Sequence, residues 1–536
     1  MAHAIAPDYG QNFLLPPCVE DWVPANHPAR FIREFVDQIN LAELGFEMPT
    51  ASNGRPPYAP SMLLKIWLYG YFNRIRSTRK LEAACHEHLS LVWLTGMNAP
   101  DHNSLWRFWN ENKKALRAVF KQTVQVAVRT GCVGMALQAL DGTKIEAVAS
   151  GYSGWSKEHM EKLMAQLDQA LEETELKIHE ENSGKGDMGY GLPAGLEERK
   201  ALRERIKAGL EQLAADGRKN YHPVEPEARR MKVGSSNRFA YNAQVVVDEK
   251  EGVIMACENT RQENDIGQLA PMIQQARENV GVAAQDTTTL ADTGYSSGQD
   301  LQAAQAQGTA VLIPLKGGDK DNPYARQHFQ INVKDKTVTC PRGVQLDYEG
   351  STIKRDVRME RYRCHCKDCP VRTHCTQDPK GRQIEVWPHE AAVQEMAKRL
   401  EQSSNQQKLL RRGRIVELCF AHIKQHGSFR RWTVWGLEGV KTQWAMLCAT
   451  SNLRVLYRCW LSKQPKSSIG ALKALVAARK RCLIGLLQSF LLVGTSLLLK
   501  SNPIRNGSFC LVWPKYYSAS SPLKPFETDS AALPHL

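Results

Sequence analysis

The sequence predicts an α/β protein in which an all-helical N-terminal region precedes a mixed sheet flanked by helices. Two observations lead to this fold class. Residues 1–135 have the pattern of helices joined by tight turns, and residues 135–316 contain short apolar, β-branched runs bounded by turn residues. A chain of 536 residues is also long enough to form several domains with sizeable cores.

Three segments of the N-terminal region have the features of helices. Residues 61–75 are mostly apolar, residues 77–89 open on Ser77 as an N-cap, and residues 103–131 end at Gly131. Short helices of this kind fit a helix-turn-helix module that binds DNA.

Basic side chains on these helices are the candidates for contacts with DNA phosphates, and a solvated basic face is the alternative. We expect Trp106 and Phe108 to lie in the core between the helices. The candidate phosphate contacts are Arg79, Lys80, Arg107, Lys113 and Lys114.

The middle of the chain has the pattern of strands. The five runs are residues 135–142, 143–150, 239–260, 287–295 and 309–316. Residues 156–217 are instead rich in Glu, Lys, Leu and Ala, with a break of glycine and proline near their centre. This composition predicts a helical hairpin inserted into the sheet domain.

Three acidic residues have the local setting of ligands for a divalent metal. Asp141 and Asp292 each close an apolar run, at the end of a predicted strand, and Glu417 lies in a long helical stretch. Carboxylate oxygens are the ligands that Mg²⁺ prefers, and two ions about 4 Å apart can stabilise a displacement at phosphorus. The implied substrate is the backbone of a nucleic acid.

Each of the three also has a simpler interpretation. Asp141 and Gly142 form an Asp-Gly pair that is common in hairpin turns, and Asp292 could begin a turn. Residues 292–294 copy the Asp-Thr-Gly triplet of aspartic proteases, but residues 141–143 have the triplet in the wrong order for a second lobe. Glu417 shares one helical stripe with Arg414 and Lys424, which suits either a polyanion beside a metal or a surface ion-pair stripe.

The net charge and the start of the chain bear on partners and compartment. The formal charge of +14 favours partners that carry phosphate. The N-terminus has no basic segment followed by an apolar one, as a signal peptide would have, so we expect a cytoplasmic protein. Its 14 cysteines should therefore stay reduced, and clustered ones favour a metal over disulfides.

One cluster of cysteines lies between Asp292 and Glu417. Cys366 and Cys369 have the CxxC spacing with which two thiolates reach one tetrahedral Zn²⁺. A cluster of reduced core cysteines or a redox-labile patch is the alternative to this structural zinc. The remaining candidate ligands are Cys340, Cys364 and Cys375, with His365 and His374 as substitutes.

Several blocks in the order found here give a resemblance to a known family. Residues 54–82 and 100–109 carry it in the helical part, and residues 141–147, 241–248, 290–297 and 416–424 carry it beyond. From about residue 10 to 460, the chain resembles bacterial insertion-sequence transposases of the DDE superfamily. The resemblance implies a ribonuclease H-like catalytic domain with a helical N-terminal domain and a cysteine-bearing insertion.

The resemblance also implies the domain boundaries. We expect a helical DNA-binding domain at 1–135 and a catalytic domain at 136–460, which contains the helical insertion at 156–217 and a cysteine-rich insertion at 325–400. Residues 461–536 form a tail of uncertain structure, and its apolar stretch 482–499 reaches only the lower limit of a membrane span. We therefore do not expect a membrane protein.

What the resemblance implies for function is a metal-dependent enzyme. Asp141, Asp292 and Glu417 would be the catalytic triad, bind Mg²⁺ or Mn²⁺, and support hydrolysis and transesterification of phosphodiester bonds. The partners would be double-stranded DNA at the element ends and the target, and a second copy of the chain on that DNA. No small-molecule substrate is expected, and the protein would associate with the nucleoid. The alternative is a catalytically inactive relative that acts as a DNA-binding repressor.

The chain departs from the family at one position beside the triad. Relatives usually hold an arginine four residues before the glutamate, where this chain has Gly413 between Arg412 and Arg414. Lys424, seven residues after Glu417, is kept. Because Arg414 lies about 60° from Glu417 on a helix and Arg412 about 140°, we expect Arg414 to take over the phosphate contact.

Overall fold

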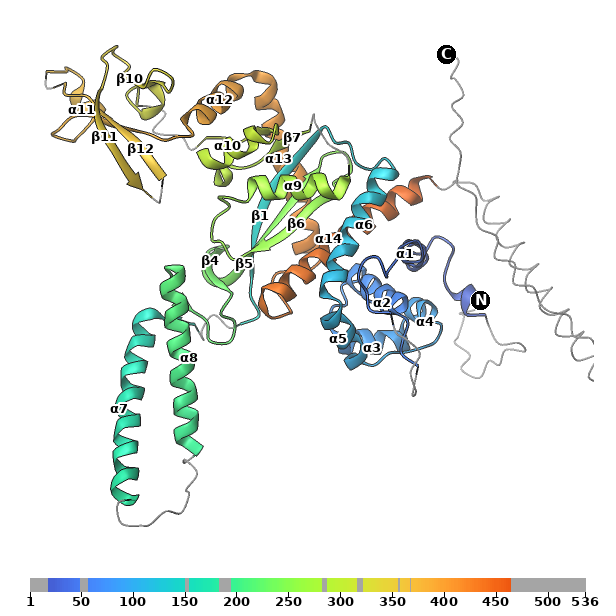
Figure 1. The fold of residues 1–536 in the computed structure, drawn as a ribbon. Coiled ribbons are helices and arrows are strands. Elements are labelled where there is room, and N and C mark those ends of the chain that lie inside the picture. Colours follow the sequence, from blue (N-terminus) through green and yellow to red (C-terminus); the bar gives the residue numbers. More distant parts are fainter. Residues whose placement is uncertain are drawn as a thin grey trace, which may run out of the picture. The chain divides into compact units, whose positions relative to one another are not determined.

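A computed structural model gives the fold of the chain (Figure 1). It describes residues 18–48, 56–149, 154–182, 194–281, 287–315, 322–354, 357–366 and 368–463. The predicted tail, with its apolar stretch 482–499, lies outside the described residues. Within the described residues, no helix is both long and apolar enough to cross a membrane.

The described part of the N-terminal region is helical, as predicted. Ser77 is the N-cap residue of α3, and Gly131, with a φ of +72°, follows the end of α6. A positive φ is a conformation that glycine adopts without strain, so Gly131 can end this helix. The helices are α1 (Pro28–Asp37), α2 (Pro60–Phe72), α3 (Thr78–Glu87), α4 (Leu89–Leu94), α5 (His102–Glu111) and α6 (Lys113–Arg129).

The prediction that Trp106 lies in the core is wrong. In α5 the buried residues are Leu105, Phe108 and Trp109, which follow the i, i+3, i+4 spacing of one helical face. Trp106 falls outside this face and is 61% exposed, whereas Phe108 is buried as expected. Because Trp106, Phe108 and Trp109 are close together in the sequence, the sequence alone does not show that only two of them lie on the buried face of α5.

The central sheet is mixed, with the order β4-β5-β1-β7-β8 and with β6 paired to β5. Strand β5 runs antiparallel to β1, β4 and β6, whereas β1, β7 and β8 are parallel. This is the sheet of a ribonuclease H-like fold. Its strands are β1 (Leu137–Glu146), β4 (Arg229–Val233), β5 (Ser236–Asp248), β6 (Ile254–Thr260), β7 (Thr288–Leu290) and β8 (Ala310–Leu312).

Strand β1 corrects two expectations at once, because Asp141 neither ends a strand nor forms a hairpin turn. Residues 135–142 and 143–150 were expected as two strands, but β1 continues through Asp141 and Gly142 to Glu146. On one edge β1 pairs with β5 as far as Glu146. On the other edge its pairing with β7 stops at Ala139. Asp141 therefore lies where the parallel neighbour ends, although its own strand does not.

Helices from the second half of the chain pack against this sheet and against the helical region. Helix α13 packs against β1, β5 and β7, and α9 packs against β6. Helix α14 packs against β6, α6 and α2 (Figure 1). These helices are α9 (Leu269–Val280), α10 (Gly298–Ala306), α12 (Glu390–Glu401), α13 (Ser403–Ala421) and α14 (Gly436–Lys463).

Buried polar side chains fasten α14 to its neighbours. Asn452, which is 0% exposed, accepts a hydrogen bond from the backbone N–H of Ile254 and donates one to its carbonyl, both at 2.8 Å. It also donates to the Thr123 hydroxyl in α6. Trp444 donates from its indole N–H to the carbonyl of Gln244 in β5. One hydrophobic core consequently contains side chains from the helical region, the sheet and α14.

Two further parts of the chain have small cores of their own. Helices α7 (Lys157–Asn182) and α8 (Ala194–Asp216) pack on one another, and β2 (Trp155–Ser156) pairs with β3 (Asn220–Tyr221) beside them. The cysteine-bearing region has a separate core around Phe329, Tyr362 and Ile384. Its elements are β9 (Gln330–Asn332), β10 (Thr337–Thr339), β11 (Asp347–Lys354), β12 (Val357–Arg363), α11 (Arg372–Cys375) and β13 (Gln383–Val386).

Candidate active site

Asp141 is a mostly buried carboxylate with two polar partners. One of its oxygens accepts a hydrogen bond from the N–H of Gly142 at 2.8 Å. The other forms an ion pair with Arg412 of α13 at 3.0 Å. Burial, together with the nearby charge of Asp292, raises the pKa of Asp141 to about 6 against the lowering effect of Arg412. Asp141 and Asp292 therefore lie close enough to interact.

Asp292 follows β7, which is the parallel neighbour of β1. It caps the short helical turn Thr293–Tyr295, and its side chain accepts a hydrogen bond from the N–H of Gly294 at 2.8 Å. Because β1 and β7 run in the same direction, residues beyond the end of β7 reach the part of β1 that contains Asp141. The sheet thus brings together two of the three predicted acidic residues.

Glu417 lies on α13, the helix that packs against β1, but its side chain is exposed. Its carboxylate is directed back toward Gly413, where an added Cβ atom would lie 3.1 Å from its Oε1 atom. The helix therefore places Glu417 near the strand of Asp141, while its side chain points along the helix surface.

Two arginines flank Gly413, and Arg412 is the one that contacts a residue of the predicted catalytic triad. Arg412 pairs with Asp141, whereas Arg414 is exposed. The expectation that Arg414 contacts a DNA phosphate stays a prediction, because the anion that Arg412 meets here is the Asp141 carboxylate on β1. The packing of α13 on β1 brings the Arg412 guanidinium within reach of Asp141.

Lys424 approaches the same strand from the segment after α13. It lies in a π-helical turn, His422–His426, so the regular α-helical spacing on which the expected stripe with Arg414 and Glu417 rests ends at Ala421. Its ammonium donates a hydrogen bond to the hydroxyl of Thr143, two residues beyond Asp141 and on the same face of β1. Burial lowers the pKa of Lys424, and the charge of Asp141 opposes this lowering.

The structure adds an acidic residue that the sequence did not indicate. Asp265 accepts hydrogen bonds from the side-chain amides of Asn242 at 2.8 Å and Gln244 at 2.7 Å. Burial, together with the charges of Asp265, Asp141 and Asp292, raises the pKa of Tyr295 well above its ordinary value. Asp265 follows the exposed polar segment 261–264 and closes no apolar run, so no signal in the sequence distinguished it.

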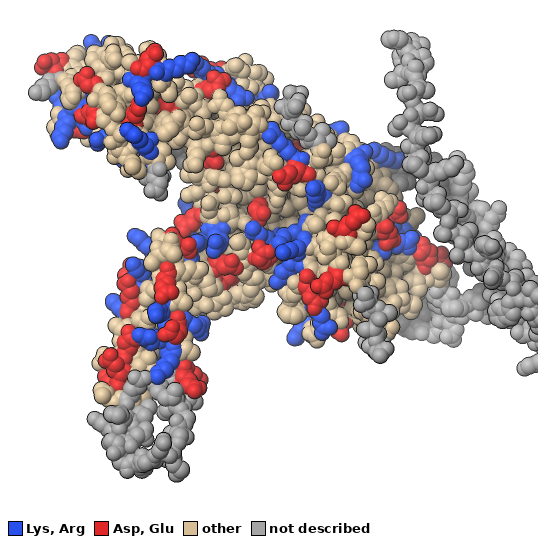
Figure 2. Space-filling model, in the orientation of Figure 1, with Lys and Arg blue, Asp and Glu red and all other residues tan. Residues whose placement is uncertain are grey.

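The predicted phosphate contacts in the helical region lie mostly on its surface. Arg79, Lys80, Arg107 and Lys114 are exposed, and Lys113 is half-buried. On the face shown in Figure 2, Lys and Arg are interspersed with Asp and Glu and do not form one uniform patch. On that face, the basic side chains therefore mark no single path for a polyanion.

The five predicted cysteine ligands line one cavity in the cysteine-bearing region. Burial raises the pKa of Cys364 to about 12 and also raises that of Cys375. In the described part of the chain, no group of three or more His, Cys, Asp or Glu side chains is arranged so that it could hold a metal ion. The structure therefore gives no support to the zinc site, which stays a prediction.

Two family models match the chain. One, described as "Transposase domain (DUF772)", matches residues 17–111, and the other, described as "Transposase DDE domain", matches residues 339–457. The chain belongs to the DDE transposases. A comparison with curated proteins finds no match.

Between them, the two matched ranges leave out residues 112–338 of this transposase. The first contains the helices α1 to α5, and the second contains Glu417 and Lys424. Asp141 and Asp292 lie in neither range. Their assignment within the transposase therefore depends on the geometry of β1 and β7.

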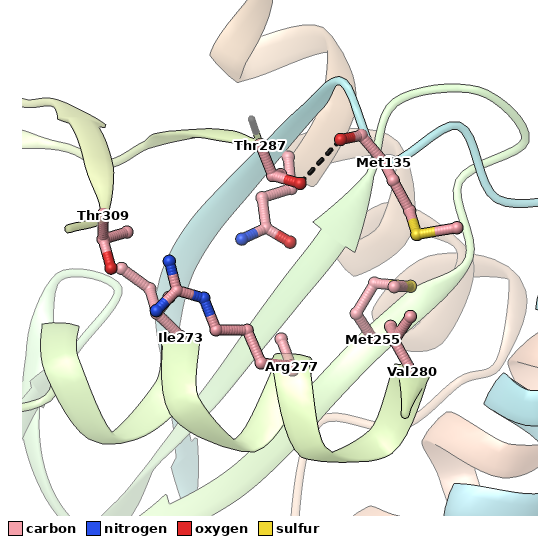
Figure 3. Close-up of a pocket in the computed structure, with 9 residues that line it drawn as sticks. Met135, Met255, Ile273, Arg277, Val280, Thr287 and Thr309 are labelled. Atoms are coloured by element: carbon pink, nitrogen blue, oxygen red, sulfur yellow. Dashed lines mark hydrogen bonds between the residues drawn. The ribbon is translucent and has the colours of Figure 1, made fainter. Parts of the chain in front are cut away.

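A pocket at another part of the sheet contains none of the acidic residues. Figure 3 shows it between the start of β1, helix α9 and the start of β7, with mostly apolar side chains around it. Within it the Thr287 hydroxyl donates a hydrogen bond to the carbonyl of Met135 at 2.6 Å. This pocket is thus separate from the acidic residues of the transposase, and its lining contains no carboxylate, imidazole or thiol side chain.

The donors around Asp141 and Asp292 suit a divalent metal, which DDE transposases generally use. They are carboxylates, the ligands that Mg²⁺ and Mn²⁺ prefer. A buried acceptor, the side-chain oxygen of Asn242, has no hydrogen-bond partner in this structure. The side chains as they lie do not yet form a group that could hold a metal. The chemistry of the donors therefore fits the cation, and binding requires a rearrangement of side chains such as the Asp141–Arg412 pair.

Proposed function

We propose that this transposase binds the terminal inverted repeats of its insertion sequence and catalyses metal-dependent DNA strand cleavage and strand transfer. The observation that supports it best is the pair Asp141 and Asp292. Asp141 lies on β1 and Asp292 lies just after β7, the parallel neighbour of β1, and the charge of Asp292 helps to raise the pKa of Asp141. Two carboxylates that meet in this way are suited to share divalent cations.

In this proposal Asp141, Asp292 and Glu417 hold Mg²⁺ or Mn²⁺ as the catalytic triad. Bound divalent ions stabilise negative charge at phosphorus and make a water or a 3′ hydroxyl a better nucleophile. For Glu417 to join the aspartates, its exposed side chain has to turn from Gly413 toward β1. Helix α13, which carries Glu417, packs against β1.

The basic residues around the pair have a second role in the proposal. Arg412 forms an ion pair with Asp141 in the structure. If this pair opens, the Arg412 guanidinium can donate two parallel hydrogen bonds to one DNA phosphate. Lys424 is held over the same face of β1 by Thr143. We propose that these two cations grip the phosphates that flank the scissile bond, with Arg414 contributing less.

The exposed basic residues of the helical region, Arg79, Lys80 and Arg107, are proposed to contact the phosphates of the element ends. Such contacts position the DNA without reading its sequence. We also propose that two copies of the chain act together on DNA, because joining both element ends to a target requires two ends to be held at once.

The proposal is tested with purified protein, Mg²⁺ and a DNA fragment that carries the ends of its own element. We expect nicks at the element ends, detected on a sequencing gel, and none when EDTA replaces Mg²⁺. Binding of the fragment without nicking would contradict the enzyme and favour the repressor. No binding at all would contradict both, and a fragment with scrambled ends is the control for specificity.

A further inference from the structure

Asp265 lies in a turn whose backbone donates a hydrogen bond to a buried aspartate of helix α10. The turn connects β6 to α9, and in it the N–H of Gly267 donates to Asp300 of α10 at 2.8 Å. Asp300 is only 6% exposed and also accepts from the hydroxyl of Ser297. Gly267 has a φ of +81°, which favours glycine. The position of the turn is therefore set by the fold.

The side chain of Asp265 is oriented just as firmly. Its Oδ1 atom accepts from both Asn242 and Gln244, neighbouring residues on one face of β5 that are each 0% exposed. Gln244 in turn accepts a hydrogen bond from the hydroxyl of Tyr295, just after Asp292 in the chain. Two buried amides thus occupy one carboxylate oxygen and leave the other available.

Two glycines show where the carboxylate points. A Cβ atom added to Gly294 would lie 3.1 Å from the Oδ2 atom of Asp265 and 2.8 Å from the Oδ1 atom of Asp292. A Cβ atom added to Gly142, next to Asp141, would lie 2.8 Å from the Oδ1 atom of Asp265. The carboxylate of Asp265 therefore lies against the backbone beside both proposed metal ligands, in space that a larger residue would fill.

An independent observation points to a ligand at the same place. The side-chain oxygen of Asn242 is fully buried and has no hydrogen-bond partner. Because the amide nitrogen of Asn242 is bonded to Asp265, this oxygen lies beside that carboxylate. A buried acceptor without a partner costs free energy, and a hydrated cation would supply the partner that it lacks.

We infer that Asp265 is a fourth acidic residue of the site and helps Asp292 to bind the divalent cation. The inference rests on the proposed function, since it takes Asp141 and Asp292 as metal ligands. Asp265 supplies its free Oδ2 atom, while Asn242 and Gln244 keep the carboxylate in place as positioning residues. Glycine at 142 and 294 leaves the room that this approach requires.

The test measures Mn²⁺ binding to the full chain by electron paramagnetic resonance, without DNA. Asp265→Asn keeps an oxygen that can accept from both amides but removes the charge. We expect it to bind Mn²⁺ about tenfold more weakly or worse than the wild type. Glu263→Gln, two residues earlier and exposed, removes the same charge outside the site and should change the affinity by less than about twofold.

Wild-type affinity in Asp265→Asn would overturn the inference, provided that Asp292→Asn binds Mn²⁺ weakly in the same experiment. Wild-type affinity in Asp141→Asn, Asp292→Asn and Asp265→Asn alike would instead overturn the metal site of the proposed function. Circular dichroism shows whether each variant is folded. If Asp265→Asn does not fold, the smaller neutral variant Asp265→Ser carries the same expectation.

Discussion

The acidic residues and the cysteines are both sets of metal-type ligands, but the fold treats them differently. The aspartates belong to the central sheet, and each has an assigned partner: Arg412 for Asp141, the Gly294 N–H for Asp292, and two amides for Asp265. The cysteines line a cavity in a region with a small core of its own. An ionised carboxylate has to be compensated when it is buried, whereas a protonated thiol packs as a small apolar group.

This difference separates two kinds of defect. We expect the loss of an acidic residue to impair DNA cleavage and to leave the protein folded, because the sheet does not depend on the charge of that residue. Loss of a cysteine should affect the local core first. The variants below compare the two regions, from the largest expected effect on DNA cleavage to the smallest.

The largest effect is expected from the proposed triad. Asp141→Asn, Asp292→Asn and Glu417→Gln should each abolish cleavage of end DNA, because each removes a charged ligand of the proposed metal site. Affinity for end DNA, measured by mobility shift, should stay within about twofold, since most phosphate contacts lie elsewhere. Asp335→Asn, an exposed acid in the cysteine-bearing region, is the control. Cleavage at the wild-type rate by Asp292→Asn would refute the assignment.

The next effect distinguishes the two arginines beside Gly413. Arg412→Ala should slow cleavage by roughly tenfold to a hundredfold, since a charge-assisted hydrogen bond is worth about 1.5 to 3 kcal/mol. Arg414→Ala should do less, because Arg414 is exposed while Arg412 pairs with Asp141. Cleavage rates on the same end DNA give the comparison. A larger loss of cleavage rate in Arg414→Ala than in Arg412→Ala would support the prediction from the helical angle that Arg414 makes the phosphate contact.

A smaller effect on cleavage is expected in the cysteine-bearing region. Cys366→Ser and Cys369→Ser should lose bound zinc and loosen the region, because thiolate ligation couples metal binding to folding. Elemental analysis measures the zinc, and limited proteolysis of residues 325–400 measures the loosening. Cys448→Ser, at a buried cysteine of α14, is the control for loss of a thiol far from the cluster. Wild-type protein purified without chelators and free of zinc would show that the cysteines form only a reduced core.

The smallest effect is expected at Gly413. Replacing a glycine within a helix stabilises it by up to about 1 kcal/mol, but the new Cβ atom would meet the Glu417 carboxylate. Because Glu417 is exposed, its side chain can move aside. Gly413→Ala and Gly413→Arg should therefore fold, with a free energy of unfolding equal to or slightly above that of the wild type in urea. A clear loss of stability would mean that the orientation of Glu417 is fixed.

The sequence predicted those features that depend on a local pattern. Helix signals such as Ser77 and Gly131 identified helix ends, and the apolar runs before Asp141 and Asp292 identified strands of the sheet. The continuation of β1 through Asp141 and Gly142 was missed, because pairing with β5 overrides the turn preference of an Asp-Gly pair.

What the sequence could not reveal depends on contacts between distant segments. Arg412 lies 271 residues from its partner Asp141, so no local spacing connects them. Asp265 has its hydrogen-bond donors on β5 and its backbone anchor on α10, which are separate parts of the chain. The role of such residues becomes visible only when the sheet brings their partners together.

Helix α14 packs against the helical N-terminal region, so that region and the rest of the chain cannot be treated as separate modules. Residues 1–135 look like a module in the sequence, yet the apolar surface of α6 is covered by α14, and Asn452 joins α6 to β6. A fragment that ends before residue 436 would leave this surface exposed to water and would tend to aggregate. We therefore expect a chain that ends before residue 436 to be less stable than the full-length protein, because it lacks the contacts of α14 with α6, α2 and β6.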